Sequence, residues 1–100
     1  MADLCLNLLC ATVAEERVLD ALLANDNAGV FTSSPASAHG FAHSALSTDE
    51  QVSGRSGATL VQVLVAEDRL DALLAQLQSE LTRTAVRYWV TPVIRQGEFQ

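Results

Sequence analysis

Two histidines, His39 and His43, lie four residues apart in the segment HGFAH, and they are the only histidines in the chain. Imidazole nitrogens are common ligands of zinc and copper, so the pair predicts part of a site for a divalent transition metal. Asp49 and Glu50, or a second copy of the chain, would supply the remaining ligands. The alternative is a pair of solvent-facing loop histidines that bind nothing.

An arginine flanked by glycines is the second candidate. Arg55 lies in the segment SGRSG, between Gly54 and Gly57. Glycine lets the backbone approach an anion closely, and a guanidinium can hold an anion through two parallel hydrogen bonds. Arg55 is therefore a candidate ligand for an anionic effector, and the alternative is an ordinary loop arginine.

Cys5 and Cys10 are the only cysteines. On a strand an odd spacing directs two side chains to opposite faces, so we expect two separate thiols and no disulfide. Both would be soft metal ligands if they faced a cleft, but burial is the stronger expectation. No nucleophile, base and orienting group can be assembled from the sequence, so we expect no enzymatic activity.

The helices that must position these residues come in two copies. The segment VAEERVLDALLA at 13–24 returns as VAEDRLDALLA at 65–75, with one residue fewer. Thr12 and Glu15 have capping-box spacing, which predicts that the first helix starts at Thr12. Each copy carries an apolar stripe at helical spacing. The stripes consist of Val18, Leu19, Leu22 and Leu23, and of Leu70, Leu73, Leu74, Leu77 and Leu81.

Four stretches read as strands. Residues 4–9 and 60–65 are continuously apolar, whereas 30–39 and 86–94 contain Pro35 and Pro92 and should lie at sheet edges. Two β-α-β units predict a single α+β domain over residues 1–100, with the ferredoxin-like order βαββαβ. The sheet should be antiparallel and four-stranded, with two helices on one face. Residues 42–58 should form a flexible loop between the second and third strands.

Alternation along the two central strands separates two faces of the sheet. The wholly apolar set suits the side covered by helices: Leu4, Leu6, Leu8, Val61, Val63 and Val65. The other set is too apolar for water and predicts a subunit interface. It contains Cys5, Asn7, Leu9, Leu60, Gln62 and Leu64. Its two amides should pair with each other or across the interface. Tyr88 and Trp89 should point to opposite faces, one of them into the core.

The charge balance limits the partners. The net charge is −6, and all six cations are arginine, which argues against nucleic acid and anionic membranes as partners. No apolar run approaches the roughly 20 residues that a bilayer needs, so we expect no membrane insertion. The N-terminal apolar run lacks the leading positive charge of a signal peptide, so we expect a cytoplasmic protein.

This layout resembles the PII-like superfamily, which includes the nitrogen-regulatory PII proteins and the divalent-cation-tolerance protein CutA. The resemblance rests on the order of elements and on SAHGFAHSALSTDEQVSGRSG, residues 37–57. The His39-Gly40 step and the run from Glu50 to Arg55 are similar to a proteobacterial subgroup of uncharacterised PII-like proteins associated with heavy-metal efflux. The resemblance implies a trimer with its sheets facing inward.

The resemblance also implies a mechanism. An effector held near His39, Gly40 or Arg55 would set the state of the long loop, and a protein partner, such as a metal-efflux transporter, would read that state. A loop of this length in so small a domain is usually functional. The alternatives are a divalent-metal-binding protein of the CutA type in metal tolerance, and a small ferredoxin-like enzyme.

One segment departs from the family pattern. In nucleotide-binding PII proteins a loop after the second helix, rich in glycine and lysine, holds phosphates. Here residues 81–85 read LTRTA, which contains neither, and Arg83 is the only cation. A phosphate cradle needs inward-turned backbone amides and a cation. We therefore expect Arg83 to contribute to effector binding, and we do not expect tight binding of ATP.

Overall fold

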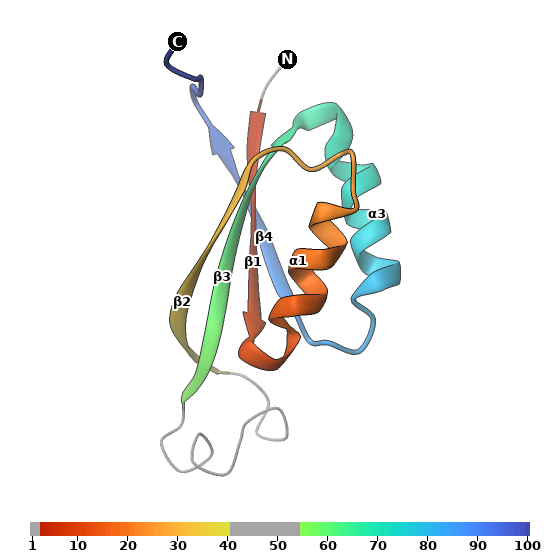
Figure 1. Cartoon of the computed structure of the whole chain (residues 1–100), viewed down its shortest axis with the longest axis vertical. Helices are drawn as coiled ribbons and strands as arrows, with labels where there is room; N and C mark the ends of the chain where they lie inside the picture. The colour runs from red at the N-terminus through yellow and green to blue at the C-terminus, as the bar shows by residue number, and fades with distance from the viewer. Residues whose placement is uncertain (1–2, 41–54) are drawn as a thin grey trace.

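The computed structural model describes residues 3–40 and 55–100. In this part of the chain one four-stranded antiparallel sheet carries two helices on one face (Figure 1). The elements are β1 (Asp3–Ala11), α1 (Glu15–Leu23), β2 (Phe31–His39), β3 (Arg55–Ala66), α3 (Leu70–Glu80) and β4 (Arg87–Val93). Short 3-10 turns, η1 (Thr12–Ala14) and η3 (Glu67–Arg69), precede the two helices. The sheet order β2-β3-β1-β4 confirms the predicted ferredoxin-like fold.

The register places the two apolar strands at the centre and the proline-containing strands at the edges, as predicted. Asn7 of β1 lies between Gln62 of β3 and Trp89 of β4. The third strand begins five residues before its predicted start at Leu60, because β2 pairs with it as far as His39 and Arg55. Residues 55–58 of the predicted loop therefore belong to a strand.

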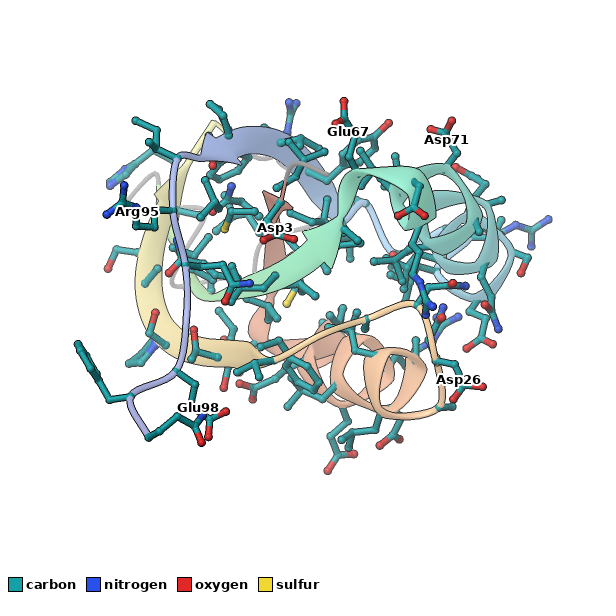
Figure 2. All side chains as sticks on the ribbon, turned by 90° about the horizontal axis from the view of Figure 1, so that it is seen from above. Asp3, Asp26, Glu67, Asp71, Arg95 and Glu98 are labelled. Carbon is teal, nitrogen blue, oxygen red and sulfur yellow. The ribbon has the colours of Figure 1, made fainter. Side chains whose placement is uncertain are left out.

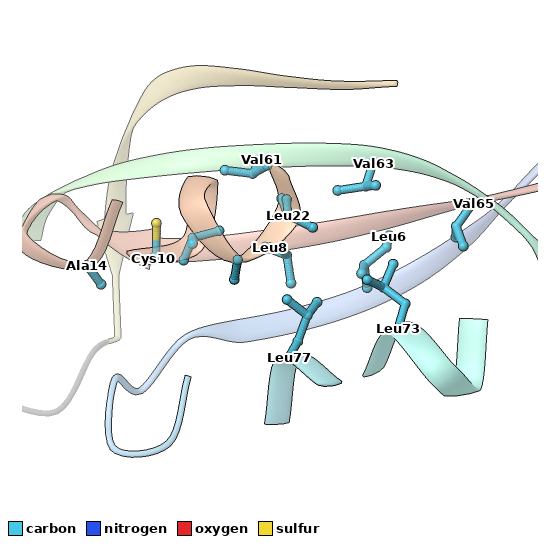
Figure 3. Close-up of a cluster of buried hydrophobic side chains, with 12 residues drawn as sticks. Leu6, Leu8, Cys10, Ala14, Leu22, Val61, Val63, Val65, Leu73 and Leu77 are labelled. Atoms are coloured by element: carbon cyan, nitrogen blue, oxygen red, sulfur yellow. The ribbon is translucent and has the colours of Figure 1, made fainter. Parts of the chain in front are cut away.

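The core lies between the sheet and the helices (Figure 3). The predicted helix-side set is confirmed, since Leu6, Val61 and Val63 have no exposed surface. From the helices, Val18, Leu22, Leu73 and Leu77 complete the core. Leu23 was expected in the same stripe, but it is 74% exposed and the buried residue beside Leu22 is Ala21. Each residue turns the helix by about 100°, so Leu23 lies roughly 140° around the helix axis from Val18, whereas Ala21 lies only about 60° from it on the other side.

The predicted capping box does not form. Thr12 is exposed and makes no capping hydrogen bond, and the α-helix begins at Glu15 after the 3-10 turn. The Glu15 carboxylate instead accepts a hydrogen bond from the Thr59 hydroxyl, with Oγ1 and Oε1 3.0 Å apart. A contact between residues far apart in sequence thus replaces the local cap, and it ties the start of α1 to β3.

Two arginines at equivalent positions of the repeat tie each helix unit to the other. Arg17 of α1 donates from Nη2 to the carbonyl oxygen of Glu80, the last residue of α3, at 2.9 Å. Arg69, just before α3, donates from Nη1 to the carbonyl oxygen of Asp26, just beyond α1, at 3.4 Å. Each arginine satisfies a carbonyl near the C-terminal end of the other helix, where such groups lack a helical partner.

The connection from α1 to β2 passes very close to the sheet at Gly29. Its amide donates to the carbonyl oxygen of Leu64 at 2.9 Å, and the Leu64 amide donates to Val30 at the same distance. A Cβ atom on Gly29 would lie 2.6 Å from that Leu64 oxygen, so only glycine fits without a backbone shift.

Candidate functional site

The candidate site lies at the end of the sheet where β2 ends and β3 begins. His39 ends β2 and Arg55 begins β3, and the two residues are direct partners in the register. His39 is exposed, and Gly40 follows with φ +87°, a backbone conformation that favours glycine. Two groups that lie sixteen residues apart in sequence therefore lie side by side at one end of the sheet.

The rest of the predicted metal site lies outside the described residues. His43, Asp49 and Glu50 fall between residues 41 and 54. Within 3–40 and 55–100, no three histidine, cysteine, aspartate or glutamate side chains are grouped as a metal site would require. The pairing of His39 with His43 on a metal therefore stays a prediction.

A further cation, Arg83, lies on the α3–β4 connection. This connection reaches the same end of the molecule as the open end of the β2–β3 hairpin (Figure 1). Arg83 is exposed and has φ +67°, and Ala85 has φ +58°. Left-handed conformations at residues other than glycine cost roughly 1–2 kcal/mol each. The Thr84 hydroxyl donates to the Leu81 carbonyl oxygen at 2.6 Å and helps to hold this turn. The connection therefore adopts glycine-like backbone geometry without containing glycine.

Arg87 is a residue that the sequence did not single out. It begins β4, is exposed, and pairs with Leu9 near the same end of the sheet. Leu9 pairs in turn with Leu60 of β3, so Arg55 lies further out along β3 than the level of Arg87. The sheet thus places Arg55 and Arg87 toward the same end, on strands separated by β1, which no spacing in the sequence reveals.

The open face of the sheet carries a compact polar cluster, defined here as Cys5, Asn7, Gln62 and Thr91. Asn7 is only 4% exposed. Its Oδ1 accepts from Gln62 Nε2 at 3.1 Å and from the Cys5 thiol at 3.7 Å. Its Nδ2 donates to the carbonyl oxygens of Cys5 and Trp89 and to the Thr91 hydroxyl, at 3.2, 3.4 and 3.5 Å. The predicted pairing of the two amides is confirmed within one chain.

Apolar side chains surround this cluster on the open face. Leu60 and Leu64 are half-buried, and Trp89 is 44% exposed. On the helix side, Tyr88 is 58% exposed and borders a small cavity of about 90 Å³ beside Leu74 and Leu77. The expectation that Tyr88 or Trp89 fills the core is therefore wrong. Both lie on the edge strand β4, where no further strand covers them.

The two cysteines occupy different environments, as predicted. Cys5 is half-buried on the open face, and Cys10 is fully buried among the core side chains; both are free thiols. Burial raises the pKa of the Cys10 thiol, and the nearby charge of Glu15 raises it further, while an interaction with the Thr59 backbone acts in the opposite direction. A thiol held protonated in this way is a poor metal ligand and a poor nucleophile.

Asn25 is a second residue that sequence analysis passed over. It lies in the connection between α1 and β2, is 6% exposed, and its Oδ1 accepts from the Asn27 amide at 2.9 Å. Its Nδ2 has no hydrogen-bond partner among the described residues.

Comparison with known proteins identifies close structural relatives. A family model described as "Protein of unknown function (DUF3240)" matches residues 1–100. The crystal structure of a DUF3240 family protein from Shewanella baltica OS155 superposes with a TM-score of 0.81 at 15% identity, over 100% of this chain and 99% of that one. No match was found among curated proteins.

Two further solved structures belong to better-described groups. CPII, a nitrogen regulatory PII-like protein from Thiomonas intermedia K12 bound to ADP, AMP and bicarbonate, gives a TM-score of 0.70 at 15% identity over 98% of both chains. The periplasmic divalent cation tolerance protein CutA from Archaeoglobus fulgidus gives 0.67 at 12% identity, over 98% of this chain and 89% of that one. At these identities the similarity shows the fold, and it confirms the resemblance to PII-like and CutA proteins.

No helix among the described residues is long and apolar enough to cross a bilayer.

Proposed function

The chain belongs to the DUF3240 family, and we propose that it is a PII-like regulatory protein. In this proposal the protein assembles as a trimer, binds a small effector at the end of its β2–β3 hairpin, and signals to a protein partner through residues 41–54. It has no catalytic role and works in the cytoplasm. The PII-like and CutA-like folds of its relatives support a role of the regulatory or metal-tolerance type.

One observation carries the proposal. His39, the last residue of β2, pairs with Arg55 of β3, and Gly40 follows directly; the α3–β4 connection, which contains Arg83, reaches the same end of the molecule (Figure 1). Residues 41–54 leave and re-enter the sheet at this point. An effector held by these groups would therefore contact both ends of the segment that the partner reads, and its differential affinity would shift the segment between states.

The charges of the site favour a small anion as the effector. Arg55 and Arg83 are cations in an acidic chain, and arginine binds carboxylate, bicarbonate or phosphate oxygens through paired N–H groups. The connection over residues 81–85 contains no glycine or lysine with which to follow a triphosphate chain. We therefore propose an anion smaller than ATP, and we expect no tight binding of ATP.

Calorimetry on charge-matched variants tests this proposal. We expect bicarbonate, AMP or ADP to bind the native protein, and we expect Arg55→Gln and Arg83→Gln to weaken that binding by roughly ten-fold or more each. Arg95→Gln is the matched control, because it removes the same charge at the opposite end of the molecule. Equal losses of affinity in all three variants would mean that only net charge matters, and would contradict a specific anion-binding site at Arg55 and Arg83.

A second candidate function is divalent-metal binding of the CutA type, for which His39 at the hairpin end is the supporting observation. Equilibrium dialysis with zinc and with copper, repeated on His39→Ala and His43→Ala, separates the two functions. Loss of metal binding in both variants would favour the metal-tolerance role. Unchanged binding in both would exclude the histidine pair as the metal site. A partner such as a metal-efflux transporter is expected under either function.

A further inference from the structure

The C-terminal tail, residues 94–100, presents apolar side chains that no other described residue of the chain covers. The tail follows β4 without forming a helix or strand. Ile94 and Phe99 are completely exposed, at 100% and 104% of their reference areas. One hydrogen bond ties the tail down, from Gln96 Nε2 to the Asp3 carboxylate at 3.0 Å. An ordered segment that exposes a phenylalanine so fully is typical of a contact surface.

The tail crosses one end of the sheet on the side away from the helices. Seen from above, it runs from Arg95 past Asp3 to Glu98, so it passes from the β4 side toward the β2 side (Figure 2). Figure 1 shows the same tail projecting beyond the sheet, at the end opposite the candidate effector site. The tail therefore belongs to the side of the molecule formed by the open face.

A shallow hollow lies on the open face near that end. Its lining is uncharged and consists of Cys5, Val30, Thr32, Gln62 and Leu64. Val30 is 74% exposed, which is unusual for a β-branched side chain with a folded sheet beside it. A neighbouring hollow shares Val30 and Leu64 and is bordered by Gln96 of the tail, so the hollow and the tail occupy the same end of the molecule.

We propose that the tail of one copy docks on a second copy of this chain, with the Phe99 ring seated in the hollow beside Cys5 and Val30. The inference rests on the self-association proposed above, and not on the effector site. In a closed cyclic assembly all copies point the same way, so a tail at one end of a protomer meets its neighbour at that same end. The hollow is also continuous with the face assigned to the subunit interface, since Cys5, Gln62 and Leu64 belong to both.

In its own chain the tail does not place Phe99 in the hollow. The hydrogen bond between Gln96 and Asp3 holds the tail beside its own sheet, and in that position Phe99 is fully exposed. The uncharged lining of the hollow calls for an apolar occupant, and Phe99 is the most exposed large apolar side chain among the described residues.

A disulfide trap tests the contact directly. In Phe99→Cys, the substituted residue should form a disulfide with Cys5 of another copy under mild oxidation, because both sulfur atoms would meet at the hollow. Cys10 is fully buried and should not take part. Leu23→Cys is the matched control, since Leu23 is 74% exposed on α1, on the opposite face. We expect covalently linked chains joined through positions 5 and 99 in the first variant, identified by peptide mass mapping, and no linkage to Cys5 in the second. A disulfide between positions 5 and 99 within one chain, or none at all, would overturn the proposal.

Alkylation of Cys5 in Phe99→Ala separates tail docking from assembly itself. At concentrations where the native protein associates, we expect Cys5 to react roughly ten-fold faster in Phe99→Ala than in the native chain. Equal rates in two proteins that both associate would overturn tail docking while leaving the proposed trimer intact. A native protein that stays monomeric at every concentration would overturn the trimer and the tail contact together, whatever the result of effector binding.

Discussion

Asn7 shows how one buried amide organises the open face of the sheet. Its side chain is 4% exposed and bonds to Gln62, Trp89 and Thr91, so it links three strands. A buried polar group that loses its partner costs about 1–3 kcal/mol. The cluster is therefore a stabilising element only while every member is present.

Replacement of Asn7 by alanine should expose this dependence. We expect Asn7→Ala to lower the free energy of unfolding by about 1–3 kcal/mol, because the buried side chain gives up its hydrogen bonds to Gln62, Trp89 and Thr91. Urea denaturation at fixed protein concentration measures the loss. Ser34→Ala, at an exposed position on β2, is the control and should leave stability unchanged. Native-like stability of Asn7→Ala would show that water replaces the amide without cost.

The buried thiol of Cys10 predicts a dependence of stability on alkaline pH. In the unfolded chain this thiol ionises near its ordinary pKa of 9.0, whereas burial and the charge of Glu15 raise the pKa in the folded state. The folded state therefore keeps the proton to higher pH, and the stability that this provides is present below the unfolded pKa and lost as pH rises through the folded pKa. We expect the free energy of unfolding to fall between about pH 8 and pH 10 more steeply in the native chain than in Cys10→Ala. Parallel pH profiles in urea denaturation would contradict this assignment.

At the scale of elements, the repeated helix has a structural explanation. Both copies supply an apolar stripe to the same face of the sheet, and both carry an arginine at the same repeat position. Arg17 and Arg69 each donate a hydrogen bond to a carbonyl at the far end of the other unit. The two contacts lie at opposite ends of the antiparallel helix pair, so they fix the spacing of the helices and their offset along the helix axes.

Loss of either arginine should therefore weaken the helix pair modestly. We expect Arg17→Ala to lower the free energy of unfolding by about 0.5–1 kcal/mol and Arg69→Ala by less, because its contact is longer, at 3.4 against 2.9 Å, and both lie in water. The losses should add in the double variant to within about 0.5 kcal/mol, since the contacts share no residues. Arg95→Ala controls for net charge. Thermal or urea unfolding of all four variants checks this, and a loss on Arg95→Ala of the same size would point to charge alone.

The sequence predicted the elements well where the signal was local. The spacing of leucines predicted both helices. Continuous apolar runs predicted the two central strands, and prolines predicted the two edge strands. The errors arose where a distant partner decided the outcome. The Glu15 carboxylate accepts a hydrogen bond from Thr59 instead of capping its own helix, and β3 starts at Arg55 because β2 continues to pair with it. Neither contact leaves a pattern within a short stretch of chain.

At the scale of the whole molecule, no element within residues 3–40 and 55–100 covers the apolar face of the sheet opposite the helices. Leu60, Leu64 and Trp89 surround the polar cluster on this face. We expect Leu60→Glu to prevent self-association, because assembly would bury the added carboxylate without a partner. Leu23→Glu adds the same charge on the outer side of α1 and should leave assembly unchanged. Sedimentation velocity over a range of concentrations measures both, with circular dichroism to confirm folding. Association of Leu60→Glu at the native strength would remove this face from the interface.

The candidate site was only partly predictable, because its residues come from separate connections. The sequence placed His39 at the end of a strand and Arg55 in a long loop, and their direct pairing appears only in the sheet register. Arg87 carried no signal, and Arg83 was singled out only through a family comparison of the loop that contains it. The predicted metal ligand His43 lies outside the described residues. Residue types could be listed from the sequence, whereas their convergence required the topology.

The pairing of Asp3 with Val93 brings the two ends of the polypeptide together, opposite the β2–β3 hairpin (Figure 1). A circular permutant could therefore join these ends through a short linker and open the chain between residues 40 and 55. Its order would be β3-α3-β4-β1-α1-β2, with every strand neighbour retained. Such a protein should fold to the same sheet and keep His39, Arg55 and Arg83 in place. Under the proposed function it would bind the effector with unchanged affinity but would not signal, because residues 41–54 would no longer connect β2 to β3.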